Sequence, residues 1–180
     1  MKATGIVRRI DDLGRVVIPK EIRRTMRIRD GDPLEIYTDN DGEVIFKKYS
    51  PIGELAPFAS QFADVMGKGT SLPVLICDRD HCVAAAGISK KEVLERRVSP
   101  QLEEVMEARR THQSRPGDTK RLMPLEGFDR AACIIVPILS SGDITGSVIL
   151  LTPETGAMPD ESDMKLAQVA AAFLGRQMEE

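Results

Sequence analysis

The feature that most constrains the fold is the series of very short elements at the start of the chain. Residues 4–10 are rich in β-forming side chains, and Asp-Asp-Leu-Gly at 11–14 predicts a turn before a second strand over residues 15–18. Pro19 ends that strand, because proline has no amide hydrogen to give to a sheet, and it suits the first turn of a helix. Apolar side chains spaced four apart then predict a short helix over residues 20–27.

A second predicted hairpin follows this helix. Strands over residues 34–37 and 43–46 flank Asp-Asn-Asp-Gly, which is a strong hairpin signal. The first 48 residues therefore predict a β-β-α-β-β unit. Without a disulfide or a metal, a unit of this size buries too little apolar surface to be comfortably stable alone. We therefore expect two chains to form a dimer by interleaving their hairpins.

The charge of the chain is unevenly distributed. The net charge of −3 combines +2 in residues 1–50 with −5 in residues 51–180. Residues 2–29 hold nine basic and three acidic residues, whereas residues 30–43 hold six acidic residues and no basic one. A concentrated positive region in an acidic protein predicts a local anion-binding face.

The rest of the chain predicts a second, α+β domain. The junction at residues 50–53 leads into a helical stripe of apolar residues, so we expect one domain over 1–50, a linker helix over 51–68 and a second domain over 69–180. Helices on either side of an antiparallel sheet are typical of the α+β class. The expected strands are 73–78, 82–86, 121–124, 132–139 and 145–151, and the expected helices are 90–95, 100–110 and 160–178.

The last predicted helix has more apolar surface than one sheet needs. We expect one stripe to pack on its own domain and the other on a partner subunit, with the helix at 55–66 joining the same bundle. The alternative is a helix packed wholly within one chain. The first stripe is Met164, Ala167, Ala170, Ala171, Leu174 and Met178, and the second is Leu166, Val169 and Phe173.

The N-terminal motif resembles the AbrB-type DNA-binding domain. The resemblance is carried by TGIVRRIDDLGRVVIP at residues 4–19, with its Gly-Arg-Val-Val-Ile-Pro core, and by EIRRT at residues 21–25. It implies a swapped-hairpin β-barrel formed by two chains, which binds DNA through an arginine-rich face. The chain as a whole is similar to AbrB-family sporulation regulators of spore-forming bacteria, in which the second domain is GAF-like.

The resemblance also implies which side chains contact DNA. They are Arg8, Arg15, Arg23 and Arg24. Arg9, which directly follows Arg8, is a second basic residue at that position of the motif. Guanidinium groups bind phosphate through paired hydrogen bonds and can read guanine edges, so the chemistry agrees. The alternative is a merely solvated charged face, which is the common role of charge runs. The acidic residues at 30–43 are expected to lie away from DNA.

Three other patterns resemble metal-binding or phosphate-binding motifs but lack the residues or the spacing that such sites need. The acidic stretch lacks the order and spacing of an EF-hand loop, so we expect turns and solubility there and no calcium. Cys77, His81 and Cys82 could join a metal or redox site, but no second ligand pair exists, and a plain hairpin fits better. Gly67-Lys68-Gly69 lacks the spacing of a phosphate loop. We therefore expect no metal, no cofactor and no enzyme activity.

These observations together predict a bacterial transcription regulator of the sporulation or developmental type. We expect a cytoplasmic protein with no membrane segment. The family resemblance implies that residues 1–50 bind double-stranded promoter DNA, that residues 69–180 form a GAF-like regulatory and oligomerisation domain, and that two DNA-binding dimers join in a homotetramer. GAF-like folds bind varied ligands and some bind none, so the sequence does not decide whether this domain takes a small-molecule effector. The alternative is an antitoxin, which binds DNA with a similar hairpin domain and neutralises a toxin through a mostly disordered tail. The predicted strands and helix over residues 73–178 argue against such a tail.

Overall fold

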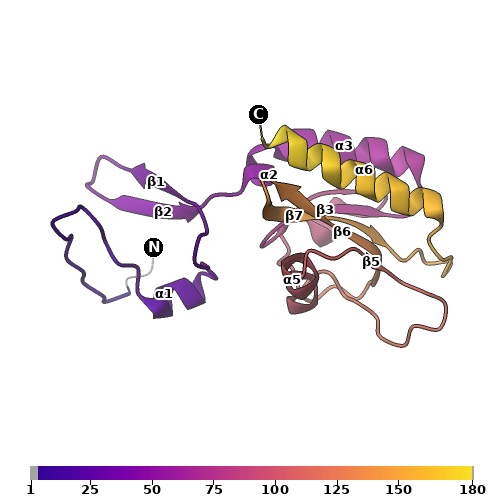
Figure 1. Cartoon of the computed structure of the whole chain (residues 1–180), viewed down its shortest axis with the longest axis horizontal. Coiled ribbons are helices and arrows are strands. Elements are labelled where there is room, and N and C mark those ends of the chain that lie inside the picture. The colour runs from indigo at the N-terminus through magenta and orange to yellow at the C-terminus, as the bar shows by residue number, and fades with distance from the viewer. Residues whose placement is uncertain (1–3, 180) are drawn as a thin grey trace. The chain divides into compact units, whose positions relative to one another are not determined.

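The computed structural model describes residues 4–179, and the chain divides into two compact units, Met1–Tyr49 and Ser50–Glu180 (Figure 1). The first unit contains one short helix and one β-hairpin. The second contains a five-stranded sheet with helices on both faces.

The hairpin of the first unit confirms the prediction from its turn sequence. Strands β1 (Leu34–Thr38) and β2 (Val44–Lys48) pair antiparallel, with Leu34 opposite Lys48 and Thr38 opposite Val44. The Asp39 carboxylate closes the turn by accepting hydrogen bonds from the amides of Asp41 and Glu43, at 3.0 and 2.9 Å. Gly42 has φ +82°, a left-handed conformation that favours glycine.

Residues 4–19 do not form the two β-strands predicted for them in this single chain. Their turn is present, with the Gly14 amide 3.0 Å from the Asp11 carbonyl oxygen. The flanking segments form no strand pairing, and Val7 and Val17 are 87% and 71% exposed. The two segments do not pair with each other beyond the turn, where the Asp11 amide donates to the Arg15 carbonyl oxygen at 3.0 Å. The predicted ladder is therefore absent from the chain taken alone.

The helix of the first unit, α1 (Lys20–Thr25), begins directly after Pro19. None of its residues is buried, and Met26 beyond its end is 54% exposed. Helices this short are marginal in water without tertiary packing. Among the described residues of this unit, many apolar side chains are exposed and therefore form no core that would stabilise α1.

The second unit is an antiparallel sheet of order β4-β3-β7-β6-β5 with helices on both faces, which confirms the α+β class. Its elements are α2 (Pro51–Glu54), α3 (Ala56–Gly69), β3 (Val74–Asp78), β4 (Cys82–Ala86), α4 (Lys90–Val93), α5 (Pro100–Glu107), β5 (His112–Gln113), β6 (Ala132–Ser140), β7 (Asp143–Leu151) and α6 (Glu161–Gln177).

The sheet separates two apolar cores. Alternating residues of a strand point to opposite faces, so Val148 and Leu150 of β7 pack in one core while Ile149 and Leu151 pack in the other. Helices α3 and α6 lie side by side over the first face, and α5 lies on the opposite face (Figure 1). No helix within residues 4–179 has the length and apolar content needed to cross a membrane.

The terminal helix α6 has a well-defined start and a close contact near its end. Asp160 caps the first turn by accepting a hydrogen bond from the Asp163 amide at 2.8 Å, and the Asp163 carboxylate accepts one in return from the Asp160 amide. Near the other end, a side chain at Gly175 would place its Cβ 2.1 Å from the carbonyl oxygen of Leu139. The glycine therefore lets α6 lie directly against β6.

Three predicted segments of the second unit have different bounds in the structure. Residues 121–124 form no strand; only Leu122 bridges to Ala132, because Pro124 lacks an amide hydrogen and β5 takes the adjacent edge of β6. The helix predicted at 90–95 ends at Val93. The linker helix expected over 51–68 is divided into α2 and α3, and α3 packs on the sheet of the second unit.

Candidate functional site

The five arginines predicted to contact DNA come from three segments of the first unit. Arg8 and Arg9 lie on the extended segment before the turn, Arg15 lies just after that turn, and Arg23 and Arg24 lie on α1. Four of the five are exposed, and Arg23 is half-buried. Exposed guanidinium groups can reach an external anion without first being released from a core.

Arg15 is held by Asp11 across the turn. Its Nε lies 2.7 Å from Asp11 Oδ2, and its amide donates to Asp11 Oδ1 at 2.8 Å. The backbone hydrogen bond from Arg15, followed by the one from its side chain, lowers the pKa of the Asp11 carboxyl below its ordinary value. Asp11 is therefore ionised at neutral pH, and it directs a guanidinium that remains 69% exposed.

Arg23 is less available than the other four arginines. Its guanidinium lies 2.5 Å from a carboxylate oxygen of Asp30, and its side chain is 36% exposed. Its Nε is buried without a hydrogen-bond partner among the described residues. Arg24 on the same helix is exposed.

Several acidic residues between 30 and 43 have structural contacts. Asp32 accepts a hydrogen bond from the Arg29 amide at 2.8 Å and lies 3.9 Å from the Lys48 ammonium group. Lys48 also donates to the Arg27 carbonyl oxygen at 3.0 Å, so it ties β2 to the segment after α1. These contacts stabilise turns and pairings, in agreement with the structural role expected of this stretch.

The Cys77–Cys82 segment forms the hairpin expected from its sequence. The two cysteines face each other on β3 and β4, and both are fully buried. The hydrogen bond with Cys82, together with burial, raises the pKa of the Cys77 thiol well above its ordinary value, so it stays protonated and weakly reactive. Within residues 4–179 no three His, Cys, Asp or Glu side chains lie close enough together to hold a metal ion.

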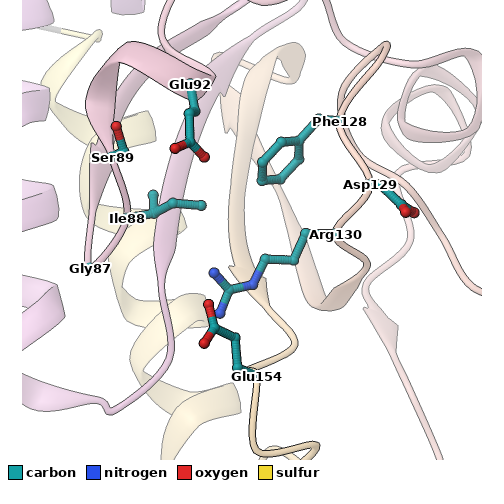
Figure 2. Close-up of a pocket in the computed structure, with 8 residues that line it drawn as sticks. All are labelled: Gly87, Ile88, Ser89, Glu92, Phe128, Asp129, Arg130 and Glu154. Carbon is teal, nitrogen blue, oxygen red and sulfur yellow. The ribbon is translucent and has the colours of Figure 1, made fainter.

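The second unit contains a cavity of about 510 Å³ that the sequence did not reveal. It is lined by the segment that follows β4, the segment that precedes β6 and the segment that follows β7. Glu92 and Phe128 point into the space, and the Arg130 guanidinium lies beside the Glu154 carboxylate (Figure 2). Arg130 is positioned by a hydrogen bond from its Nε to the Thr152 carbonyl oxygen at 3.0 Å.

This cavity is a candidate site for a small-molecule effector. Its volume is within the range common for small-molecule sites, and its walls offer carboxylates, one guanidinium and one aromatic ring. These groups can orient a small polar molecule through hydrogen bonds and charge. No sequence signal could have found them, because the residues lie on three separate segments that only the fold brings together.

The comparisons with known proteins agree with this two-unit organisation. A family model described as Stage V sporulation protein T C-terminal, transcription factor, matches residues 54–179. A second model, described as Antidote-toxin recognition MazE, bacterial antitoxin, matches residues 7–53. For the second unit, the GAF domain of an Acinetobacter phosphoenolpyruvate-protein phosphotransferase is a similar solved structure, with 14% identity, coverage of 73% of this chain and 84% of that one, and a TM-score of 0.50.

Two proteins of Bacillus subtilis (strain 168) are similar in sequence. The transition state regulatory protein AbrB is 63% identical over 51 residues, which cover 28% of this chain and 52% of that protein. Stage V sporulation protein T is 50% identical over 182 aligned residues, which cover both chains completely.

The class of protein follows from the two units together. An AbrB-like N-terminal domain joined to a GAF-like domain is the organisation of a transcription factor. Within that class, the chain belongs to the family of Stage V sporulation protein T. The predicted family and the predicted two-part fold are confirmed. The folded second unit also speaks against the antitoxin alternative, which requires a mostly disordered tail.

Proposed function

We propose that this chain regulates transcription by binding promoter DNA through its N-terminal unit, with Arg8, Arg9, Arg15, Arg23 and Arg24 as the contacting side chains. The observation that carries the proposal is the exposure of four of these cations on a unit that is 63% identical to part of AbrB. Arginine suits this task because its planar group binds phosphate through two hydrogen bonds and stays charged at any physiological pH.

A regulatory role fits the chain better than a catalytic one. Its family model is that of a transcription factor, and Cys77, Cys82 and Cys133 are buried. Burial raises the pKa of the Cys133 thiol to about 11, so this group is protonated at neutral pH. Action on DNA also places the protein in the cytoplasm of the bacterium.

The salt dependence of DNA binding tests this proposal. Four arginines per chain, leaving Arg9 aside, place eight guanidiniums of a dimer near one duplex. If most contact phosphate, the logarithm of the binding constant should fall with the logarithm of salt concentration with a slope of about −7. Fluorescence anisotropy of the full chain with a labelled duplex at several salt concentrations measures this slope. A slope close to zero would contradict the proposal.

We further propose that the first unit dimerises by pairing residues 4–19 of two chains. The support is the exposed apolar surface of this segment, where Ile10 and Leu13 are 69% and 71% exposed, together with the absence of buried residues in α1. A second chain would supply both the missing strand partners and the missing core. The dimer also doubles the arginines presented to a two-fold symmetric duplex.

A further inference from the structure

A basic segment of the second unit lies outside the arginine-rich N-terminal unit. Residues 109–121 contain five basic residues and one acidic residue, in a unit whose net charge is −5. Four of the five are arginines, the side chain best suited to paired hydrogen bonds with phosphate. We call this segment the basic loop; its cations are Arg109, Arg110, Arg115, Lys120 and Arg121.

The cations of the basic loop are exposed and have no acidic partner among the described residues. Elsewhere in the same unit, basic side chains do form ion pairs, as Lys90 does with Asp64 at 3.4 Å and Lys165 with Glu161 at 2.7 Å. The basic loop therefore concentrates positive charge on a unit that has ample negative charge to neutralise it. Such a concentration attracts an external polyanion.

The structure anchors at both ends the part of the basic loop that follows β5. The Ser114 amide donates to the Cys133 carbonyl oxygen at 2.8 Å, and the Ala132 amide donates to the Leu122 carbonyl oxygen at 2.8 Å. Between these anchors the chain leaves the sheet edge after β5 without further secondary structure (Figure 1). The loop therefore presents its charges from a fixed base on β6.

The acidic residue of the basic loop, Asp118, stabilises a turn within the loop itself. The Asp118 carboxylate accepts a hydrogen bond from the Arg115 amide at 2.7 Å, and the Asp118 amide donates to the Arg115 carbonyl oxygen at 3.1 Å. Gly117 completes the turn with φ +91°. Because Asp118 stabilises the turn through backbone groups, the Arg115 guanidinium stays available to an external acceptor.

Protection of the sheet edge is the simplest other role for these charges. Exposed edges are commonly guarded by charged side chains, which discourage pairing with another chain. Here the edge strand β5 has only two residues, His112 and Gln113, and neither belongs to the five cations. So short an edge needs little protection, and five cations exceed that need.

We propose that the basic loop is a second DNA contact, which binds backbone phosphates of a duplex. The proposal rests on the proposed function, since that function brings a polyanion to the protein. The five basic side chains of the loop are exposed, and cations of this kind bind backbone phosphates without reading bases, so we expect the loop to contact the backbone alone.

The test compares two double variants of the full chain that change net charge equally. Arg115→Gln with Lys120→Gln removes two cations of the basic loop. Lys91→Gln with Arg176→Gln removes two exposed cations of the same unit outside the loop. Binding to a labelled duplex, well longer than the site of one N-terminal dimer, is measured over a salt series, and circular dichroism confirms that both variants are folded.

The loop variant is expected to lose about 1.8 from the salt slope for each basic loop that contacts the duplex, because each lost phosphate contact removes about 0.9. Its affinity should fall equally for all sequences, and the control variant should match the unchanged protein. Equal slopes for the loop variant and the control would overturn the proposal. So would an unchanged DNA slope combined with lost binding to anionic phospholipid vesicles, which would assign the loop to a membrane surface.

The same experiment separates this proposal from the proposed function. If the unchanged protein binds DNA steeply and Arg15→Ala weakens it, the function stands, and only the loop variant decides the present proposal. If the unchanged protein binds no duplex, the function fails, and the second contact fails with it.

Discussion

Replacing Arg15 by alanine is expected to weaken DNA binding by at least about a hundredfold at low salt and to make the salt slope shallower by about two. A dimer loses two guanidiniums, each of which contributes about 0.9 to the slope. A hydrogen bond to a charged group contributes roughly 1.5–3 kcal/mol, and 1.4 kcal/mol corresponds to tenfold. Asp11 should increase this loss of affinity. Without the Arg15 side chain, the ionised Asp11 carboxylate has no cationic partner and repels the phosphates of bound DNA.

The control for this variant is Lys47→Ala. Lys47 lies on β2, where its ammonium group is 4.4 Å from the centre of the Tyr37 ring, and we place it outside the binding face. Anisotropy titrations of both variants at several salt concentrations give the two slopes. An unchanged slope for Arg15→Ala, or a larger loss for Lys47→Ala, would show that the binding face has been wrongly placed. Equal weakening of all sequences would assign Arg15 to phosphate, and relaxed preference at one position would assign it to a base.

Introducing charge at Val169 and Phe173 is expected to reduce the assembly from four chains to two. We propose that α3 and α6 of the second unit join two dimers through the apolar surface they leave exposed. Phe173 is stacked against Phe62 with ring centroids 5.4 Å apart yet stays 42% exposed, and Val65 and Val169 are 63% and 67% exposed. Burying a carboxylate without a partner costs far more than such a contact contributes, so Val169→Glu with Phe173→Glu should abolish it.

Sedimentation equilibrium of the full chain measures this change. The control is Gln61→Glu with Gln168→Glu, which adds the same charge to exposed polar positions of the same two helices. The control should keep four chains. A four-chain assembly that survives Val169→Glu with Phe173→Glu would place the dimer–dimer interface elsewhere, and the wholly intramolecular role of α6 would then hold.

The strongly patterned elements were predictable from the sequence. Strand β6 and the second half of β7 are almost wholly apolar, the two strands join through Ser-Ser-Gly-Asp, and the structure pairs Ser140 with Asp143 across that turn. The first stripe of α6 was also identified correctly, since Ala167, Ala170, Ala171 and Leu174 are buried. Alternation and helical spacing report burial on one face, which is a local property of the sequence.

The elements that were predicted wrongly depend on contacts with residues remote in the sequence. Residues 4–19 have β-forming composition, but in this single chain the two predicted strands do not pair and most of their apolar side chains stay exposed. Leu122 makes one bridge only, because the neighbouring edge of β6 is already paired with β5. The sequence likewise identified Arg15 through a motif but did not identify Asp11 as the residue that orients it. Such pairings are set by tertiary geometry.

The most direct test of the central claim is NMR of the arginine side chains during a DNA titration. In the full chain labelled with ¹⁵N-arginine, the Nε–Hε signals are assigned by single Arg→Lys substitutions, and a duplex is then added. The account predicts that the signals of Arg8, Arg15 and Arg24 shift. The signal of Arg96 should stay fixed, because its guanidinium donates to the Gly127 carbonyl oxygen at 2.9 Å. Bound DNA with unshifted N-terminal arginines would contradict the account.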